Sequence, residues 1–124
     1  MAAVREGRFM TDRRREPRVQ VNLPLRVWGT DSQGERFLQE VHARDISLSG
    51  ALLSELEVEL RPGDLIGVQY EGKQARFRVV WLRHSGDRRK IQAAIHRLSS
   101  DQCPWLHLLG ETSETAAFAS LQVP

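Results

Sequence analysis

The sequence predicts an all-β protein, a six-stranded antiparallel β-barrel with a short C-terminal helix and a flexible N-terminal arm. Three observations predict it. Apolar and polar residues alternate with a period of two along several stretches, as in strands that bury one face. Short turns separate these stretches and leave little room for crossover helices. A chain of 124 residues can bury one modest core and forms one domain.

The strands are expected in a simple order along the chain. In the first, valine and leucine alternate with polar residues, but Pro24 lacks an amide donor. This strand should therefore lie at an edge or carry a bulge at the proline. Closing the sheet into a barrel removes the exposed edges of the remaining strands. The expected strands are 19–28, 37–45, 50–53, 65–70, 75–81 and 91–95.

The same pattern, or its absence, predicts the structure of the two ends of the chain. Residues 1–12 are polar and show no periodicity, so we expect a flexible leader before the barrel domain at 13–110. A short helix is expected over 100–109, with an apolar face positioned to plug a barrel mouth. A loosely held tail is expected at 111–124.

One side chain is assigned by the alternation itself. Trp81 lies four residues after Phe77 in an expected strand, so both should face inward. Core packing is then the expected role of Trp81.

Charge and cysteine content limit the class of function. The formal net charge is only +2, so a generally basic surface that coats nucleic acid is not indicated. Sixteen of the 18 basic residues are arginine, and six of these fall within the first 18 residues. A GC-rich genome accounts for the number of arginines but not for their clustering. Cys103 cannot form an internal disulfide, and no signal peptide or apolar run of about 20 residues is present, which predicts a cytoplasmic protein without a membrane span.

The sequence gives little support for an enzyme or a metal site. The four histidines fall in different elements, without the spacing of metal ligands. Cys103 has no neighbouring base, and no Gly-x-Ser-x-Gly motif surrounds Ser47 or Ser49. We therefore expect no catalytic residues, no metal and no cofactor.

Two short motifs carry the functional signal. Arg14 and Arg18 are four residues apart and directly precede the first strand, and Pro17 restricts the residue before it to an extended or turn conformation. A guanidinium group can bind a phosphate or the O6 and N7 edge of guanine through two hydrogen bonds. The second motif, 45–50, closes the second strand. Taken alone, it could be a strand-ending turn in which aspartate and serine satisfy their own backbone.

Together, Arg14-x-x-x-Arg18 and Asp45-x-Ser47-x-x-Gly50 resemble the motifs of the PilZ domain family. The order, spacing and position of the motifs on a small barrel carry the resemblance, which covers about residues 13–109. It implies a six-stranded barrel that acts as a bacterial receptor for the second messenger cyclic di-GMP. The chain departs from the family at Ala93-Ala94-Ile95-His96, where a Gly-Val-x-Phe-like stretch is common.

The resemblance also implies roles for individual residues. Arg14 and Arg18 would bind the phosphates and the guanine edges, and Asp45 and Ser47 would meet polar atoms of guanine and phosphate. Gly50 would allow close approach of the backbone, and Arg13 would go with binding of a stacked ligand dimer. A downstream protein partner in motility, biofilm or related signalling, and a homodimer, are further expectations.

Two alternatives remain open from the sequence. One is a ligand-independent PilZ-like interaction module. The other is a small barrel that binds single-stranded nucleic acid, which would use exposed arginines such as Arg76 and Arg78. Stacking would then fall to Trp28, Tyr70 and Trp81.

Overall fold

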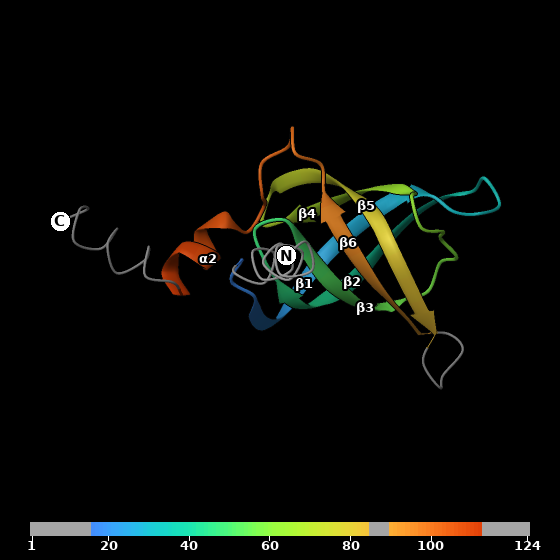
Figure 1. Ribbon diagram of the computed structural model, residues 1–124. Helices are drawn as coiled ribbons and strands as arrows, with labels where there is room; N and C mark the ends of the chain where they lie inside the picture. Colours follow the sequence, from blue (N-terminus) through green and yellow to red (C-terminus); the bar gives the residue numbers. More distant parts are fainter. Residues whose placement is uncertain (1–15, 85–89, 113–124) are drawn as a thin grey trace, which may run out of the picture.

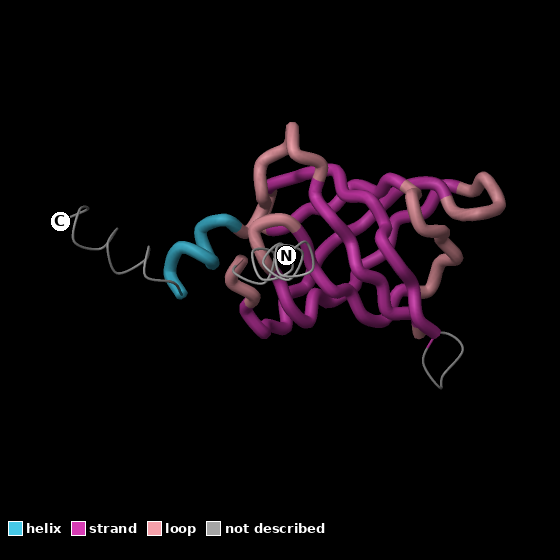
Figure 2. The backbone as a smooth tube through the Cα atoms, in the orientation of Figure 1, coloured by secondary structure: helices cyan, strands magenta, loops and turns pink. Residues whose placement is uncertain are grey.

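Six antiparallel strands close into a barrel in the computed structural model, which describes residues 16–84 and 90–112. The order around the barrel is β1-β2-β3-β6-β5-β4, and one short helix follows the last strand (Figure 1). The strands cross one another as a closed cage in the tube view (Figure 2). The elements are β1 Val19–Thr30, β2 Arg36–Ile46, β3 Gly50–Leu56, β4 Leu65–Tyr70, β5 Lys73–His84, β6 Ile91–Arg97 and α2 Leu106–Thr112.

The predicted all-β fold is confirmed, and every expected strand is present. Alternation gives most of the inward residues correctly because each strand buries one face in the barrel and exposes the other. The leader at 1–12 and the first arginines of the arm lie outside the described residues. The boundaries of the domain at 13–110 and of the tail at 111–124 stay predictions.

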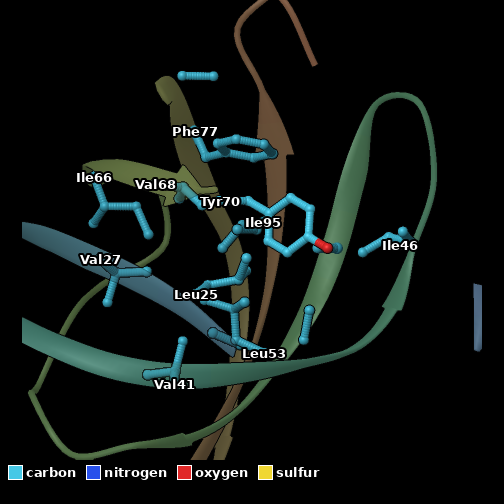
Figure 3. Close-up of a cluster of buried hydrophobic side chains, with 14 of the residues drawn as sticks. Leu25, Val27, Val41, Ile46, Leu53, Ile66, Val68, Tyr70, Phe77 and Ile95 are labelled. Carbon is cyan, nitrogen blue, oxygen red and sulfur yellow. The ribbon is translucent and has the colours of Figure 1, made fainter. Parts of the chain in front are cut away.

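The core fills the barrel with side chains from all six strands (Figure 3). Trp105, just before α2, is fully buried, and its ring centroid lies 5.4 Å from that of Phe77. Leu109 is also buried. The segment after β6 therefore closes one end of the core, as the sequence predicts for its helix.

Pro24 is accommodated without an edge strand. It pairs with His42 of β2, whereas the pairing of β1 with β4 covers only Arg26 to Gly29. Pro24 therefore has no β4 partner, so its missing N–H leaves no acceptor of that strand unpaired. The bulge that the sequence predicts in this strand lies slightly earlier, between Gln20 and Leu23.

The prediction that Trp81 faces inward is wrong. A register shift between Val79 and Trp81 inserts an extra residue into β5 opposite β6. Val79 stays in the core, but Trp81 is 38% exposed, and the inward position after the bulge passes to Leu82. A bulge exchanges the inward-facing and outward-facing positions of the residues after it. The alternation of Phe77, Val79 and Trp81 in the sequence does not reveal that a bulge is present.

The helix begins later than the sequence predicts. The segment from Leu98 to Trp105 forms turns, with the Asp101 amide donating to the Leu98 carbonyl at 3.0 Å. The helix starts only at Leu106, after Pro104. Proline is suited to a helix start because it has no amide donor to leave unsatisfied.

Antiparallel order brings distant segments to the same barrel end. The start of β1, the loop from β2 to β3 and the end of β6 all lie there, and α2 extends from it (Figure 1). The segment 16–18 and the loop 47–49 are therefore neighbours, although about 30 residues separate them.

Candidate ligand site

One row of outward-facing residues crosses five strands of the barrel. Backbone pairing places Asp45 opposite Leu52, Leu52 opposite Ala94, and Ala94 opposite Trp81. On the other side, Asp45 is opposite Gln20. The small Ala94 separates two larger side chains, so the row is low at its middle. A carboxylate and an indole therefore lie on the same outer face.

A hollow of about 690 Å³ lies over this row. Its walls come from the segment before β1, the loop from β2 to β3, and the outer faces of β5 and β6. The lining residues are Glu16, Arg18, Asp45, Ser47, Ser49, Gly50, Ala51, Leu52, Val80, Trp81, Ala94, Ile95 and His96. Both sequence motifs thus contribute to one concave surface.

Arg18 reaches the acceptor motif across the hollow. Its Nη2 atom donates to the two carboxylate oxygens of Asp45 at 3.3 and 3.4 Å. The Arg18 side chain is 67% exposed, whereas that of Asp45 is only 19% exposed. Such a solvated pair contributes about 0 to 1 kcal/mol, so the guanidinium can be redirected to another anion at little cost.

Glu16 makes the second contact between the arm and the loop. The hydroxyl of Ser49 donates to Glu16 Oε1 at 2.7 Å. Glu16 and Arg18 therefore hold the segment before β1 against the loop with opposite charges. The sequence motifs did not single out this role of Glu16 and Ser49, because the contact joins residues 33 positions apart.

Ser47 is engaged within its own loop. Its hydroxyl oxygen accepts from the Gly50 amide at 3.1 Å, and its amide donates to the Gly50 carbonyl at 2.9 Å. Ser47 is only 8% exposed. The turn-forming role considered for this motif is therefore present, and it shapes the wall of the hollow.

Gly50 is required by the packing of β3 on β6. A Cβ atom at this position would lie 2.5 Å from the carbonyl oxygen of Ile95. Backbone cannot move aside cheaply, so only glycine permits this approach of the two strands. The close approach that the structure shows at Gly50 is thus between strands of the barrel.

Trp81 adds an aromatic wall that sequence reasoning missed. The guanidinium carbon of Arg83 lies 5.3 Å from the ring centroid, a cation–π distance. The Arg83 side chain thereby brings a further positive charge to this side of the hollow. Trp81 faces outward because of the bulge in β5, and the sequence carries no local feature that predicts this bulge.

A second ion pair at this end of the barrel lies outside the hollow. Arg76 donates through Nε and Nη2 to the two oxygens of Asp101, each at 3.0 Å. These hydrogen bonds, with one from the Arg76 amide, lower the pKa of Asp101 to about 2. They also raise the pKa of Arg76.

The structure does not support a reactive cysteine, a metal site or a membrane-spanning helix among the described residues. Burial raises the pKa of the Cys103 thiol, which disfavours the reactive thiolate. Within residues 16–84 and 90–112, no group of three histidine, cysteine or acidic side chains could hold a metal ion. In the same part of the chain, no helix has the length and apolar character needed to cross a membrane.

The structure brings four of the predicted site residues together. Arg18, Asp45, Ser47 and Gly50 all line the hollow. The predictions for Arg13 and Arg14 fall on residues outside those that the structure describes. Binding of a ligand by all six residues stays a prediction.

Comparison with known proteins agrees with the fold. The family model of the PilZ domain matches residues 12–109, which is most of the chain. A comparison with curated proteins finds no significant match. The matched residues span all six strands and both motifs. The chain therefore belongs to the PilZ domain family, whose members in general act as receptors for cyclic di-GMP.

Proposed function

We propose that this chain is a non-enzymatic receptor and adaptor for cyclic di-GMP, and that the hollow over β2, β3, β6 and β5 is its binding site. The observation that carries the proposal is the meeting of three kinds of group on one concave surface. Arg18 supplies donors, Asp45 supplies acceptors and Trp81 supplies an aromatic face. A guanine nucleotide offers acceptor atoms, donor atoms and a flat ring.

Each group has a chemical role in the proposal. Arg18, with Arg14 four residues earlier in the sequence, binds a phosphate or the O6 and N7 atoms of guanine. Asp45 accepts from guanine N–H groups, and Ser47 and Gly50 keep the loop in shape. Trp81 stacks on a base. Charge-assisted hydrogen bonds contribute about 1.5 to 3 kcal/mol each, and micromolar binding needs about 8 kcal/mol in total.

The output of the receptor follows from the contacts of the arm. A ligand phosphate that takes Arg18 from Asp45 also disturbs the neighbouring bond between Glu16 and Ser49. The segment before β1 then changes position, and the protein presents a different surface to a downstream partner.

Isothermal titration calorimetry tests the proposal with a matched pair of ligands. Cyclic di-GMP and cyclic di-AMP carry the same phosphates and differ in the base. We expect cyclic di-GMP to bind in the micromolar range or tighter, and cyclic di-AMP at least about ten-fold more weakly. Absence of binding at low salt up to high micromolar ligand contradicts the proposal. Equal affinity for the two ligands contradicts guanine recognition.

The same titration gives the ligand stoichiometry. Arg13 precedes the arginine motif, and we propose that it favours a stacked pair of ligands. Two ligands per chain are then expected for the wild-type protein and one for Arg13→Ala. One ligand per chain in both proteins contradicts this role of Arg13.

A ligand-independent interaction module is the second candidate, and one observation favours it. Glu16 and Arg18 already have partners in Ser49 and Asp45, so the segment 16–18 has a defined position on the barrel without a nucleotide. Under this alternative, a partner protein binds equally well with and without cyclic di-GMP. A pull-down with a partner, with and without the nucleotide, separates the two candidates.

Single-stranded nucleic acid is a weaker candidate on the same geometry. Tyr70 is buried, and Arg76 and Arg78 are engaged by Asp101 and by the Gly63 carbonyl. Three of the residues that the sequence suggests for this role, Tyr70, Arg76 and Arg78, are thus not available for stacking or for free cation contacts. Titration with a homopolymeric oligonucleotide checks this alternative.

A further inference from the structure

Three successive carbonyl groups of the loop 47–49 accept hydrogen bonds from one segment of the chain. The indole nitrogen of Trp105 donates to the Ser47 carbonyl at 2.8 Å. Arg97 supplies the other two donors: its Nε atom is 3.0 Å from the Leu48 carbonyl, and its amide is 2.7 Å from the Ser49 carbonyl. The end of β6 and the segment before α2 thus hold every carbonyl of this loop.

This arrangement orients the amide groups of the loop in the opposite direction. In a planar trans peptide the N–H points away from the C=O of the preceding residue. The amides of Leu48 and Ser49 must therefore point away from Arg97 and Trp105. Across residues 16–84 and 90–112, neither amide has a hydrogen-bond acceptor. The next amide, that of Gly50, has the same orientation and donates to the Ser47 hydroxyl, which lines the hollow.

Two adjacent amides that point to one side form a donor pair for an anion or a carbonyl oxygen. Such a pair matches the acceptor atoms of cyclic di-GMP, which are the phosphate oxygens and guanine O6 and N7. The pair exists only while the loop carbonyls face the other way. Its orientation therefore depends on the donors behind the loop.

Arg97 is the main donor behind the loop. Among the described residues, the hydrogen-bond acceptors of its guanidinium are the backbone carbonyls of Leu48, Leu98 and Asp101, and Arg97 is half-buried. The Asp101 carboxylate is instead engaged by Arg76. Arg97 thus joins the loop to the turn at 98–101 through a rigid fork of donors.

We infer that Arg97, assisted by Trp105, is a positioning residue of the proposed ligand site, which turns the Leu48 and Ser49 amides toward the ligand. The inference rests on the proposed function, because the acceptor that the amides meet is the nucleotide. Neither Arg97 nor Trp105 lines the hollow, so both act through the loop.

Three variants of the full chain test the inference. Arg97→Met removes the side-chain donors at similar length, and Arg97→Lys restores a single flexible donor. Arg76→Met is the matched control, since it breaks the contact with the other side of Asp101 and touches neither the loop nor the hollow. The dissociation constant for cyclic di-GMP is measured by calorimetry, and the urea midpoint is measured for each variant.

We expect Arg97→Met to weaken binding about ten-fold and Arg97→Lys to recover part of this loss. Arg76→Met is expected to bind cyclic di-GMP within about two-fold of the wild type, even where its urea midpoint falls by as much as that of Arg97→Met. An affinity loss below about three-fold in Arg97→Met overturns the inference. An equal loss in Arg97→Met and Arg76→Met also overturns it, because the effect then reflects stability alone.

A measurement on the protein without nucleotide separates this inference from the proposed function. In ¹H–¹⁵N spectra, we expect the Leu48 and Ser49 amide signals to shift or broaden in Arg97→Met and to stay in place in Arg76→Met. Unchanged signals in Arg97→Met overturn the positioning role, whether or not the wild-type chain binds cyclic di-GMP. Failure of the wild type to bind, with these signals perturbed, overturns the proposed function and the ligand role of the amides but retains the control of the loop by Arg97.

Discussion

Arg18 and Asp45 lie 27 residues apart and form an ion pair across the hollow, with a shortest distance of 3.3 Å. The pair joins the two sequence motifs before any ligand is considered. Because the arginine is mostly exposed and the aspartate is mostly covered, the contact is weak and reversible. A nucleotide phosphate can compete for the guanidinium and leave the carboxylate free to accept from a base.

Replacement of Arg18 tests the donor half of the site. Arg18→Ala is expected to weaken cyclic di-GMP binding by at least about ten-fold, since a charge-assisted hydrogen bond of about 1.5 to 3 kcal/mol is lost. Calorimetry measures the change. Arg26→Ala is the control, because Arg26 is another exposed arginine of the same part of the chain that pairs with Glu40 and lies outside the hollow. Equal weakening by both variants would show a general charge effect.

Trp81 should report ligand binding by its fluorescence. We expect cyclic di-GMP to change the tryptophan emission of the wild type and of Trp28→Phe, but not of Trp81→Phe. Trp28 lies over Gly67 on another part of the barrel, and Trp105 is fully buried. Trp81→Ala should weaken binding about ten-fold through loss of base stacking. A ligand signal that survives in Trp81→Phe excludes the stacking role.

Gly50→Ala is expected to destabilise the barrel by about 1 to 3 kcal/mol, as measured by urea unfolding. The added Cβ would lie 2.5 Å from the Ile95 carbonyl oxygen, so β3 and β6 must separate locally. Gly34→Asn serves as the control: its φ of 84° is one that asparagine tolerates, and no atom lies within 4 Å of the position that the new Cβ would occupy. A loss below about 0.5 kcal/mol in Gly50→Ala would contradict the packing constraint.

Asp101 should make stability dependent on acid pH. Its pKa is lowered from 3.8 to about 2, so its contribution is complete above pH 4 and is lost as the pH falls toward 2. Urea unfolding between pH 5 and pH 2 measures this loss. In Arg76→Met the side-chain hydrogen bonds that lower the pKa of Asp101 are absent and only the bond from the backbone amide remains, so the slope in this range should be smaller. Identical slopes in the two proteins would contradict the assigned cause.

Strand alternation predicts most of this fold because one buried face per strand leaves a direct mark on the sequence. The interior positions Leu25, Val27 and Val41 follow from it, whereas the buried Ile46 does not, because a register shift lies between Ala43 and Asp45. The motif residues Arg18 and Asp45 were also identifiable, since their spacing resembles a family pattern. The outward position of Trp81 was not predictable, because it depends on how β5 pairs with β6.

The sequence by itself determined the number of strands, their buried faces where no bulge intervenes, and the two motifs, all of which are encoded within a few neighbouring residues. Only the tertiary structure decided that Glu16 meets Ser49, that Trp81 faces the hollow, and that Arg97 and Trp105 hold the loop 47–49. These contacts join residues 33 to 58 positions apart or depend on a bulge. Such geometry is set when the barrel closes and distant strands come into register, and no local pattern records it.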